Sequence, residues 1–197
     1  MFAEETLERV RALAVADPSG AYDMRSSRLK AMTAAAPTTE AYNHFIFRWV
    51  RLTRPAVYVE TGTDRGRSAA HAAEGWSGTS VVSIDIDPVC SAQLMALRFP
   101  NVVALTGDSI ELAGVTDAGK IDVDVLFLDS LHEHDHLLAE FALYAPKVRH
   151  GGLILLDDIH LGVGMQRAWN TLSAGRAHTD ISVLHFSGFG AIVWEGA

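Results

Sequence analysis

The sequence predicts an α/β fold in which a doubly wound sheet of seven strands, mostly parallel, ends in an antiparallel hairpin. Short continuous runs of Val, Ile and Leu are typical of strands buried on both faces of a parallel sheet. Helical segments alternate with these runs. Acidic residues end or closely follow five of them, at Glu60, Asp85, Asp108, Asp129 and Asp157. Because open α/β sheets bind ligands at the carboxyl ends of their strands, we expect the functional site at this edge.

An N-terminal helical cap is predicted over residues 1–40, followed by one α/β domain over residues 41–197. Residues 1–36 have helical periodicity without strand signals, apart from a DPSG turn at residues 17–20. A Thr cap after Pro37 begins a further helix that continues through EAYNHFIFRWVRL. We expect the cap to cover the ligand-binding edge.

Strands and helices alternate after Pro55. Predicted strands lie at residues 56–60, 81–85, 102–105, 123–128, 152–156, 181–185 and 190–194, and FSGFG joins the last two as a hairpin. Predicted helices comprise SAAHAAE, from near Gly66 to Gly75, then PVCSAQLMALRF, HDHLLAEFALYAPKV and GMQRAWNTL. The order is that of a Rossmann-like sheet with helices on both faces.

Composition narrows the class of partner. The net charge is −8 with no run of Lys or Arg, which disfavours nucleic acid and favours a small molecule. The longest apolar runs have the length of strands, so no membrane span is expected, and MFAEETLERV does not resemble a signal sequence. We therefore expect a cytoplasmic protein. The single cysteine, Cys90, cannot form an internal disulfide and is expected to be a small buried apolar residue.

The segment VYVETGTDRGRSAAHAA indicates a nucleotide-type ligand. A strand leads to Glu60, Gly62 and Gly66 bracket a tight turn, and a helix of small residues follows. A carboxylate at Glu60 would repel the pyrophosphate of a dinucleotide but attract the ammonium and sulfonium of S-adenosylmethionine. Asp85, at the end of the second strand, suits ribose hydroxyls in either case. GTDRG lacks the full G-x-G-x-x-G pattern, so a purely structural turn is the alternative.

The next strand ends in TGDS, which adds a second polar pair. Asp108 and Ser109 could present a carboxylate and a hydroxyl to an adenine amino group. A turn with an Asp helix cap would have the same sequence.

Three carboxylates follow the next two strands. Asp129 ends one strand, while Asp157 and Asp158 end its neighbour. Hard oxygen ligands of this kind suit Mg²⁺ or Ca²⁺. Alternatively, Asp157 caps a turn and Asp129 lies beside the cofactor without a metal.

A histidine is the predicted proton acceptor. His132 lies in the loop after Asp129, and a free imidazole has a pKa of about 6.5. Three other histidines fall in the same region and remain alternatives as base or ligand: His134, His136 and His160. An all-histidine transition-metal site is less favoured because aspartates dominate the strand ends.

The motifs ETGTDRG, SIDIDP, TGDS, FLDSLH and P-x₃-HGG-x₄-DD, in this order, resemble class I S-adenosylmethionine-dependent methyltransferases. Within that class they are similar to the small metal-dependent O-methyltransferases of the catechol and bacterial sugar and macrolide types. The resemblance covers about residues 50–197 and implies that residues 41–197 form the S-adenosylmethionine-binding methyltransferase domain. Two features depart from the usual pattern: arginines at 65 and 67, and SLH after Asp129.

The resemblance also implies a set of site residues. The implied cofactor-binding residues are Glu60, Gly62, Thr63, Gly66, Ser68, Asp85, Asp108, Ser109 and Asp129. Asp129, Asp157 and Asp158 would bind Mg²⁺, or Mn²⁺ or Ca²⁺ in its place, and His132 and Asp129 would be catalytic.

The expected reaction is Mg²⁺-dependent O-methylation of a small-molecule hydroxyl, on a natural product, a sugar or a catechol-like compound. A methyltransferase-like hydroxylase similar to cephalosporin hydroxylase is one alternative, and a non-catalytic cofactor-binding subunit is another. An NAD-dependent dehydrogenase is disfavoured by Glu60.

The acceptor pocket and the assembly are not specified by the sequence. Aromatic residues at helical spacing are expected in the core rather than in an acceptor pocket: Tyr42, Phe45, Phe47, Trp49 and Trp169. His44 and Arg48 are expected on an exposed helix face. The N-terminal helices could pack across a homodimer.

Overall fold

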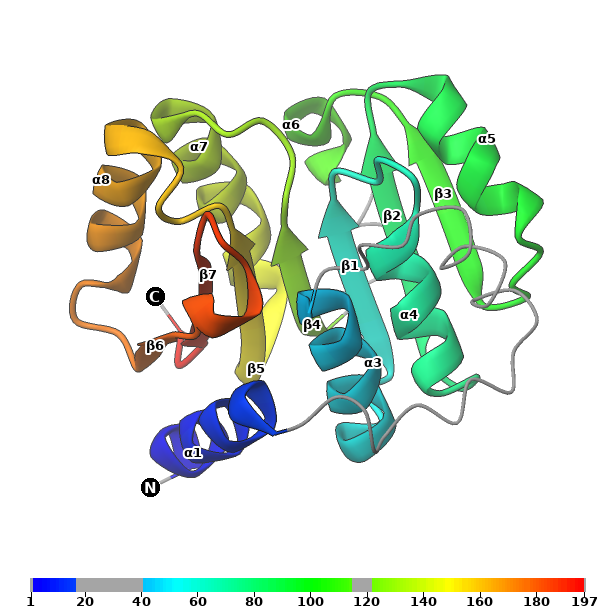
Figure 1. Cartoon of the computed structure of the whole chain (residues 1–197). Helices are drawn as coiled ribbons and strands as arrows, with labels where there is room; N and C mark the ends of the chain where they lie inside the picture. The colour runs from blue at the N-terminus through cyan, green and yellow to red at the C-terminus, as the bar shows by residue number, and fades with distance from the viewer. Residues whose placement is uncertain (1, 17–40, 115–121, 197) are drawn as a thin grey trace.

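The computed structural model describes residues 2–16, 41–114 and 122–196 and contains one seven-stranded sheet of order β3-β2-β1-β4-β5-β7-β6 (Figure 1). The five parallel strands are β1 (Val57–Thr61), β2 (Ser80–Asp85), β3 (Val102–Thr106), β4 (Val123–Leu128) and β5 (Val148–Asp157). The last strand, β7 (Phe189–Val193), is antiparallel to both β5 and β6 (His178–Asp180). The predicted fold class, including the antiparallel C-terminal hairpin, is confirmed.

Helices cover both faces of the sheet. One face carries α1 (Phe2–Val15), α3 (Ala41–Thr53), α4 (Arg67–Gly75) and α5 (Pro88–Ala96). The other face carries α6 (Ser109–Leu112), α7 (His134–Tyr144) and α8 (Gly162–Ser173). None of the helices within the described ranges combines the length and the apolarity that crossing a bilayer requires.

The two layers explain why the central strands are continuously apolar. Side chains of successive residues point to opposite faces of a sheet, and both faces of this one are covered. In β5, for example, Leu153 and Leu155 join the core on the α3 side, whereas Ile154 and Leu156 join the core on the α7 side.

The N-terminal helix packs on the sheet rather than over its carboxyl edge. Leu7 and Val10 of α1 are buried in the core, and Arg48 of α3 donates to the carbonyl oxygens of Leu13 and Ala16 at 3.4 and 3.1 Å. The predicted turn at residues 17–20 and the Thr cap lie outside the described residues. The division of the chain at residue 40 therefore stays a prediction.

The predicted burial of the five aromatic residues is confirmed, although Tyr42 also lines the cavity described below. The expected exposed helix face is wrong. The aromatic side chains of α3 and Trp169 are buried. His44 and Arg48 are only half-exposed, because His44 stacks on His71 with ring centroids 6.0 Å apart and Arg48 contacts the end of α1. Both therefore serve packing between helices.

The predicted strand at residues 181–185 is wrong. The strand β6 ends at Asp180, whose side chain accepts a hydrogen bond from the Ser182 amide at 2.9 Å and so favours a turn. A 3₁₀ turn, η4 (Ser182–Leu184), follows. Because Phe189 of β7 pairs with Asp157 of β5, the segment that precedes β7 lies at the carboxyl edge of the sheet.

Candidate active site

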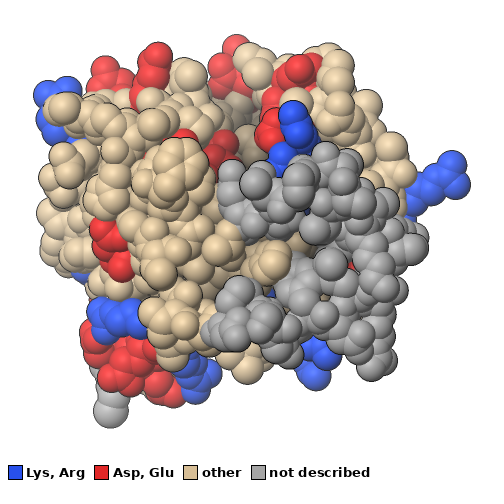
Figure 2. Space-filling view, in the orientation of Figure 1, with Lys and Arg blue, Asp and Glu red and all other residues tan. Residues whose placement is uncertain are grey.

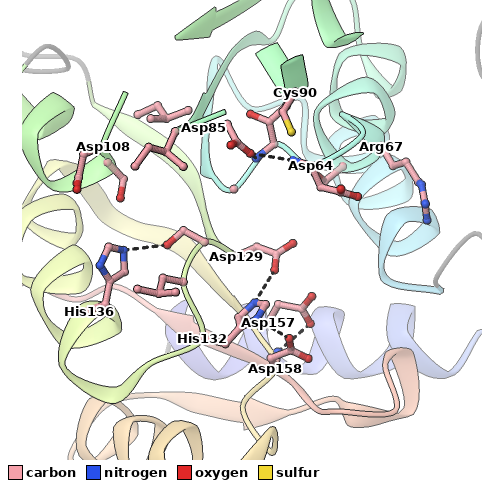
Figure 3. A pocket seen from close by; sticks show the side chains of 18 of the residues that line it. Asp64, Arg67, Asp85, Cys90, Asp108, Asp129, His132, His136, Asp157 and Asp158 are labelled. Carbon is pink, nitrogen blue, oxygen red and sulfur yellow. Dashed lines mark hydrogen bonds and ion pairs between the residues drawn. The ribbon is translucent and has the colours of Figure 1, made fainter. Parts of the chain in front are cut away.

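A cavity of about 700 Å³ opens at the carboxyl ends of the parallel strands (Figure 3). Figure 2, in the same orientation as Figure 1, shows acidic side chains along this upper edge. The predicted residues that line the cavity are Gly62, Thr63, Ser68, Asp85, Asp108, Ser109, Asp129, His132, Asp157 and Asp158. The sequence motifs thus converge on one site. Cys90 also lines the cavity and is only partly buried, which contradicts its predicted burial.

The loop after β1 needs its glycines. Gly62 has φ +85° and lies so close to β4 that a Cβ atom would stand 1.8 Å from the Asp129 carbonyl oxygen. Gly66 has φ +70° at the start of α4, where a Cβ atom would meet Leu94 at 2.9 Å. Gly66 does not line the cavity. It shapes the turn, and its predicted direct role in cofactor binding stays a prediction.

Glu60 lies behind the loop rather than in the cavity. Its carboxyl group is fully buried, and it accepts hydrogen bonds from the Tyr58 hydroxyl at 2.9 Å and the Ser83 hydroxyl at 2.7 Å. Burial raises the pKa of Glu60 to about 7, although hydrogen bonds, including one from Ser68, lower it. Glu60 does not line the cavity, and its predicted contact with the cofactor stays a prediction. Glu60 instead joins β1 to β2 and to the first turn of α4.

Asp85 holds the glycine loop in place. One carboxylate oxygen accepts hydrogen bonds from the amides of Thr63 at 2.8 Å and Asp64 at 3.0 Å, and the other accepts one from Asp87 at 2.8 Å. Asp85 also lines the cavity. A carboxylate oxygen has more than one acceptor position, so Asp85 can keep the loop bonds and still meet a ligand hydroxyl.

Asp108 caps a helix and also lines the cavity, and its predicted contact with an adenine stays a prediction. Its side chain caps α6 by accepting a hydrogen bond from the Ile110 amide at 2.7 Å. Asp108 and Ser109 also line the cavity, beside the exposed side chain of Ile86. This end of the cavity therefore offers both polar groups and an apolar surface.

The predicted acidic residues lie together at the other end. Burial and the negative charge of Asp157, with smaller effects of Glu60 and Asp158, raise the pKa of Asp129 well above its usual value. His132 lies between two of these acids, with Nε2 3.3 Å from Asp129 Oδ1 and Nδ1 3.1 Å from Asp158 Oδ2. The carboxylates thus fix the orientation of the imidazole.

The candidate histidines differ in whether they line the cavity. His134 contacts Asp135 and His160 contacts Asp180, each at 2.7 Å, and neither histidine lines the cavity. His136 does line it, but Nε2 lies 3.1 Å from the Ser130 hydroxyl and 3.4 Å from a carboxylate oxygen of the buried Glu140. Among the four predicted candidates, His132 alone contacts the acidic residues at the strand ends.

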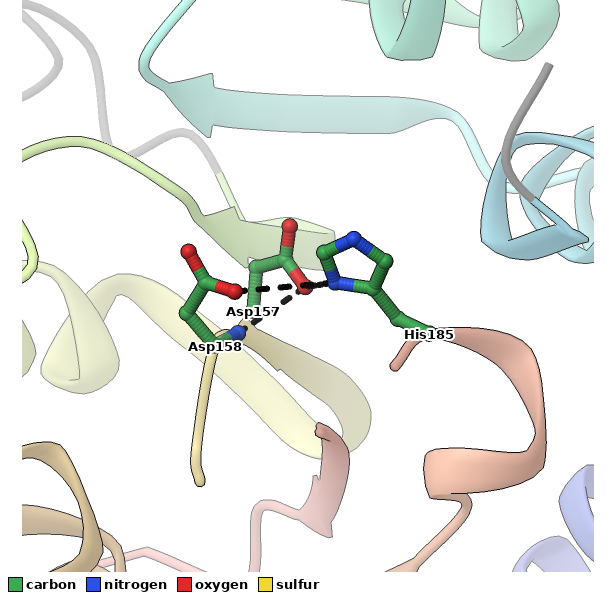
Figure 4. A group of neighbouring side chains, drawn as sticks. All are labelled: Asp157, Asp158 and His185. Carbon is green, nitrogen blue, oxygen red and sulfur yellow. Dashed lines mark hydrogen bonds and ion pairs between the residues drawn. The ribbon is translucent and has the colours of Figure 1, made fainter. Parts of the chain in front are cut away.

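Sequence reasoning missed His185. Its Nδ1 atom lies 2.8 Å from Asp157 Oδ1 and 3.6 Å from Asp158 Oδ1 (Figure 4). One donor atom from each of these three residues lies within 4.8 Å of the others. The sequence did carry a signal, because a final strand antiparallel to β5 would bring the preceding residues to the carboxyl edge.

The donor set at this end fits a divalent cation. Two carboxylates and one imidazole converge from three positions that are almost entirely shielded from solvent. Of the predicted metal ligands, Asp157 and Asp158 belong to this group. Asp129 lies next to it, where the charge of Asp157 acts on its carboxyl group and His132 bridges it to Asp158.

Comparison with protein families gives a match over residues 59–159 to a family described as a methyltransferase domain. The matched region begins in β1 and ends just after β5, so it contains the glycine loop and all three aspartates of the strand ends. No curated protein sequence matches the chain.

Solved structures share the fold. A provisionally assigned caffeoyl-CoA O-methyltransferase from Staphylococcus aureus matches with a TM-score of 0.71 and 16% identity, covering 87% of this chain and 93% of that one. An O-methyltransferase from Bacillus cereus, solved with S-adenosylhomocysteine (SAH), gives 0.67 and 20%, with coverages of 86% and 91%. TomG from Streptomyces achromogenes, an O-methyltransferase of tomaymycin synthesis solved with S-adenosylmethionine (SAM), gives 0.66 and 17%, with 87% and 91%.

Proposed function

The chain belongs to the methyltransferase domain family, and from this premise we propose that it methylates a small-molecule hydroxyl with SAM as the methyl donor and a divalent metal as a second cofactor. One observation carries the proposal. A single cavity joins the glycine loop and Asp85 to the cluster of Asp129, His132, Asp157 and Asp158. Donor site and acceptor site would then share one space.

Several features support SAM as the cofactor. The loop of Gly62 and Thr63, the carboxylate of Asp85 and the pair Asp108 and Ser109 lie along one side of the cavity, on the ends of β1, β2 and β3. Structures of similar fold were solved with SAM or SAH. The charge of Glu60 does not favour SAM over a dinucleotide, because its carboxyl group does not line the cavity. The match to the methyltransferase family favours SAM instead.

His132 is the proposed proton acceptor. When bound, SAM supplies the methyl group and a divalent metal lowers the pKa of the acceptor hydroxyl. His132 faces the cavity beside Asp129 and Asp158, which hold its ring in place. To take a proton, the ring must give up one of these two contacts, because both nitrogens face a carboxylate.

The rim of the cavity favours an acceptor with an apolar part. Leu131 and Ile86 both line the cavity, and they are 52% and 72% exposed. Apolar side chains left in water beside a polar site are typical of ligand contacts. We therefore favour a catechol-like compound or an apolar natural product over a bare sugar. Cytoplasmic location and a homodimer stay predictions.

The test is transfer of a labelled methyl group from SAM to a panel of catechols, sugars and macrolides, with Mn²⁺ or Mg²⁺ present. We expect labelled methyl ether from at least one apolar hydroxyl compound. Oxidation of an acceptor without label transfer would favour the hydroxylase alternative. Cofactor binding without turnover across the panel would favour a non-catalytic subunit.

Replacing Asp85 by alanine should weaken SAH binding by about 1.5–3 kcal/mol for each charge-assisted hydrogen bond lost, less compensation by water. The loss should exceed that in Asp64→Asn, a change on the same loop and cavity wall whose left-handed backbone, with φ 44°, Asn tolerates. Calorimetry measures both. Unchanged affinity in Asp85→Ala, or tight NADH binding by the wild type, would contradict the cofactor assignment.

A further inference from the structure

We propose that His185 is a metal ligand, and that the site formed by Asp157, Asp158 and His185 prefers first-row transition-metal ions to Mg²⁺. This inference rests on the metal dependence in the proposed function. It replaces an all-oxygen set of ligands with two carboxylates and one imidazole nitrogen.

The geometry singles out His185 Nδ1. This nitrogen contacts Asp157 Oδ1 at 2.8 Å, and the ring presents it to both carboxylates (Figure 4). The exposed fractions of the side chains are 8% for His185, 4% for Asp157 and 10% for Asp158. All three residues line the cavity. The donor atoms are thus close together and poorly hydrated, yet within reach of a ligand.

The surroundings hold these donors in place. Tyr42 meets the His185 ring edge-on at 5.3 Å between centroids, and Phe186 does so at 4.7 Å. The Ser187 hydroxyl lies 3.1 Å from His185 Nδ1 and donates to Asp158 Oδ1. The Asp158 amide donates to Asp157 Oδ1 at 2.9 Å. Outer groups that orient ligands in this way are characteristic of metal sites.

Ligand chemistry then sets the preference. Mg²⁺ favours oxygen ligands and retains water, whereas imidazole suits Zn²⁺, Fe²⁺, Co²⁺ and Ni²⁺. The Asp157 and Asp158 carboxylates accept either class of ion. The His185 nitrogen therefore provides the selectivity.

The test compares metal binding by the wild type, His185→Asn and His160→Asn. His160 is the matched control, a histidine with an Asp partner that does not line the cavity. Calorimetry with Co²⁺ and Mg²⁺ gives the affinities, and pulsed electron paramagnetic resonance of bound Mn²⁺ detects nitrogen coordination. Melting curves and SAH binding confirm that each variant is folded.

We expect one cavity site on the wild type that binds Co²⁺ at least about 100-fold more tightly than Mg²⁺. His185→Asn should weaken Co²⁺ binding about tenfold or more, change Mg²⁺ binding by less than about threefold, and abolish the nitrogen signal of Mn²⁺. His160→Asn should match the wild type in all three.

Two results would overturn the inference. If metals bind at Asp157 and Asp158 but His185→Asn keeps the nitrogen signal and the Co²⁺ preference, His185 is not a ligand, while a metal-dependent methyltransferase remains. If no metal binds the wild type, the metal dependence in the proposed function fails together with this site. Methyl transfer measured in chelator then shows whether the enzyme activity survives without it.

Discussion

Replacing His132 by alanine is expected to lower kcat by roughly 10²–10⁴-fold and to leave SAH affinity nearly unchanged. The imidazole is held at the acidic end of the cavity by Asp129 and Asp158. Assistance by a general base acts in the transition state, so its loss lowers kcat rather than cofactor affinity.

Steady-state kinetics of single alanine variants test this role. His134 and His160 do not line the cavity, so their variants should stay within about a few-fold of the wild-type kcat. His136 lines the cavity but contacts Ser130 and Glu140 instead of the aspartates. A nearly normal kcat for His132→Ala beside a strongly reduced kcat for His136→Ala would show that His136, and not His132, is the base.

Removing the metal is expected to abolish turnover. Treatment with EDTA should stop methyl transfer, and Mn²⁺ or Mg²⁺ should restore it, because the ion lowers the pKa of the acceptor hydroxyl. Asp157→Ala should prevent the restoration. SAH binding should survive both changes, because Asp85 and Asp108 lie at the ends of β2 and β3, whereas Asp157 lies at the end of β5.

Initial rates and calorimetry on the same protein samples separate these effects. Full activity in EDTA would contradict the account. Asp129, Asp157 and Asp158 would then serve only to contact the cofactor and to cap the turn, without binding a metal. Loss of SAH binding together with activity would instead show that the chelator or the mutation disturbs the whole cavity.

The main features of the fold follow from hydrophobic patterning. Parallel strands covered on both faces need continuous apolar runs, which is why GLILLD in β5 and VDVLFL in β4 were recognisable. The same logic failed at Ser182–Leu184. Leu184 and Ile181 are buried in the core, so the apolar residues reported burial but not strand geometry, while the Asp180 side chain favoured a turn.

The site was predictable where the strand direction alone fixes a position. The carboxyl ends of parallel strands share one edge, so Asp85, Asp129 and Asp157 had to gather there. The orientation of Glu60 could not be obtained from its position at a strand end. Its polar neighbours Tyr58, two residues earlier on the strand, and Ser83, opposite in the register, are the features that hold it behind the loop.

Predicting the position of His185 requires the strand order as well as the sequence. A histidine about 25–30 positions from its partners becomes a neighbour only when β7 pairs with β5 in the antiparallel direction. The incorrect strand at residues 181–185 hid this relationship by assigning His185 to the hairpin. Correct placement of the turn at Asp180 would have brought His185 to the acidic residues.

The central claim is that one cavity holds the methyl donor beside the acidic and histidine cluster. A crystal structure of the chain with SAH and Mn²⁺ tests it most directly. We predict SAH along Gly62, Asp85 and Asp108 with its sulfur toward His132, and an anomalous peak for Mn²⁺ at Asp157 and Asp158. SAH bound outside the cavity, or with its sulfur directed away from His132, would contradict the account.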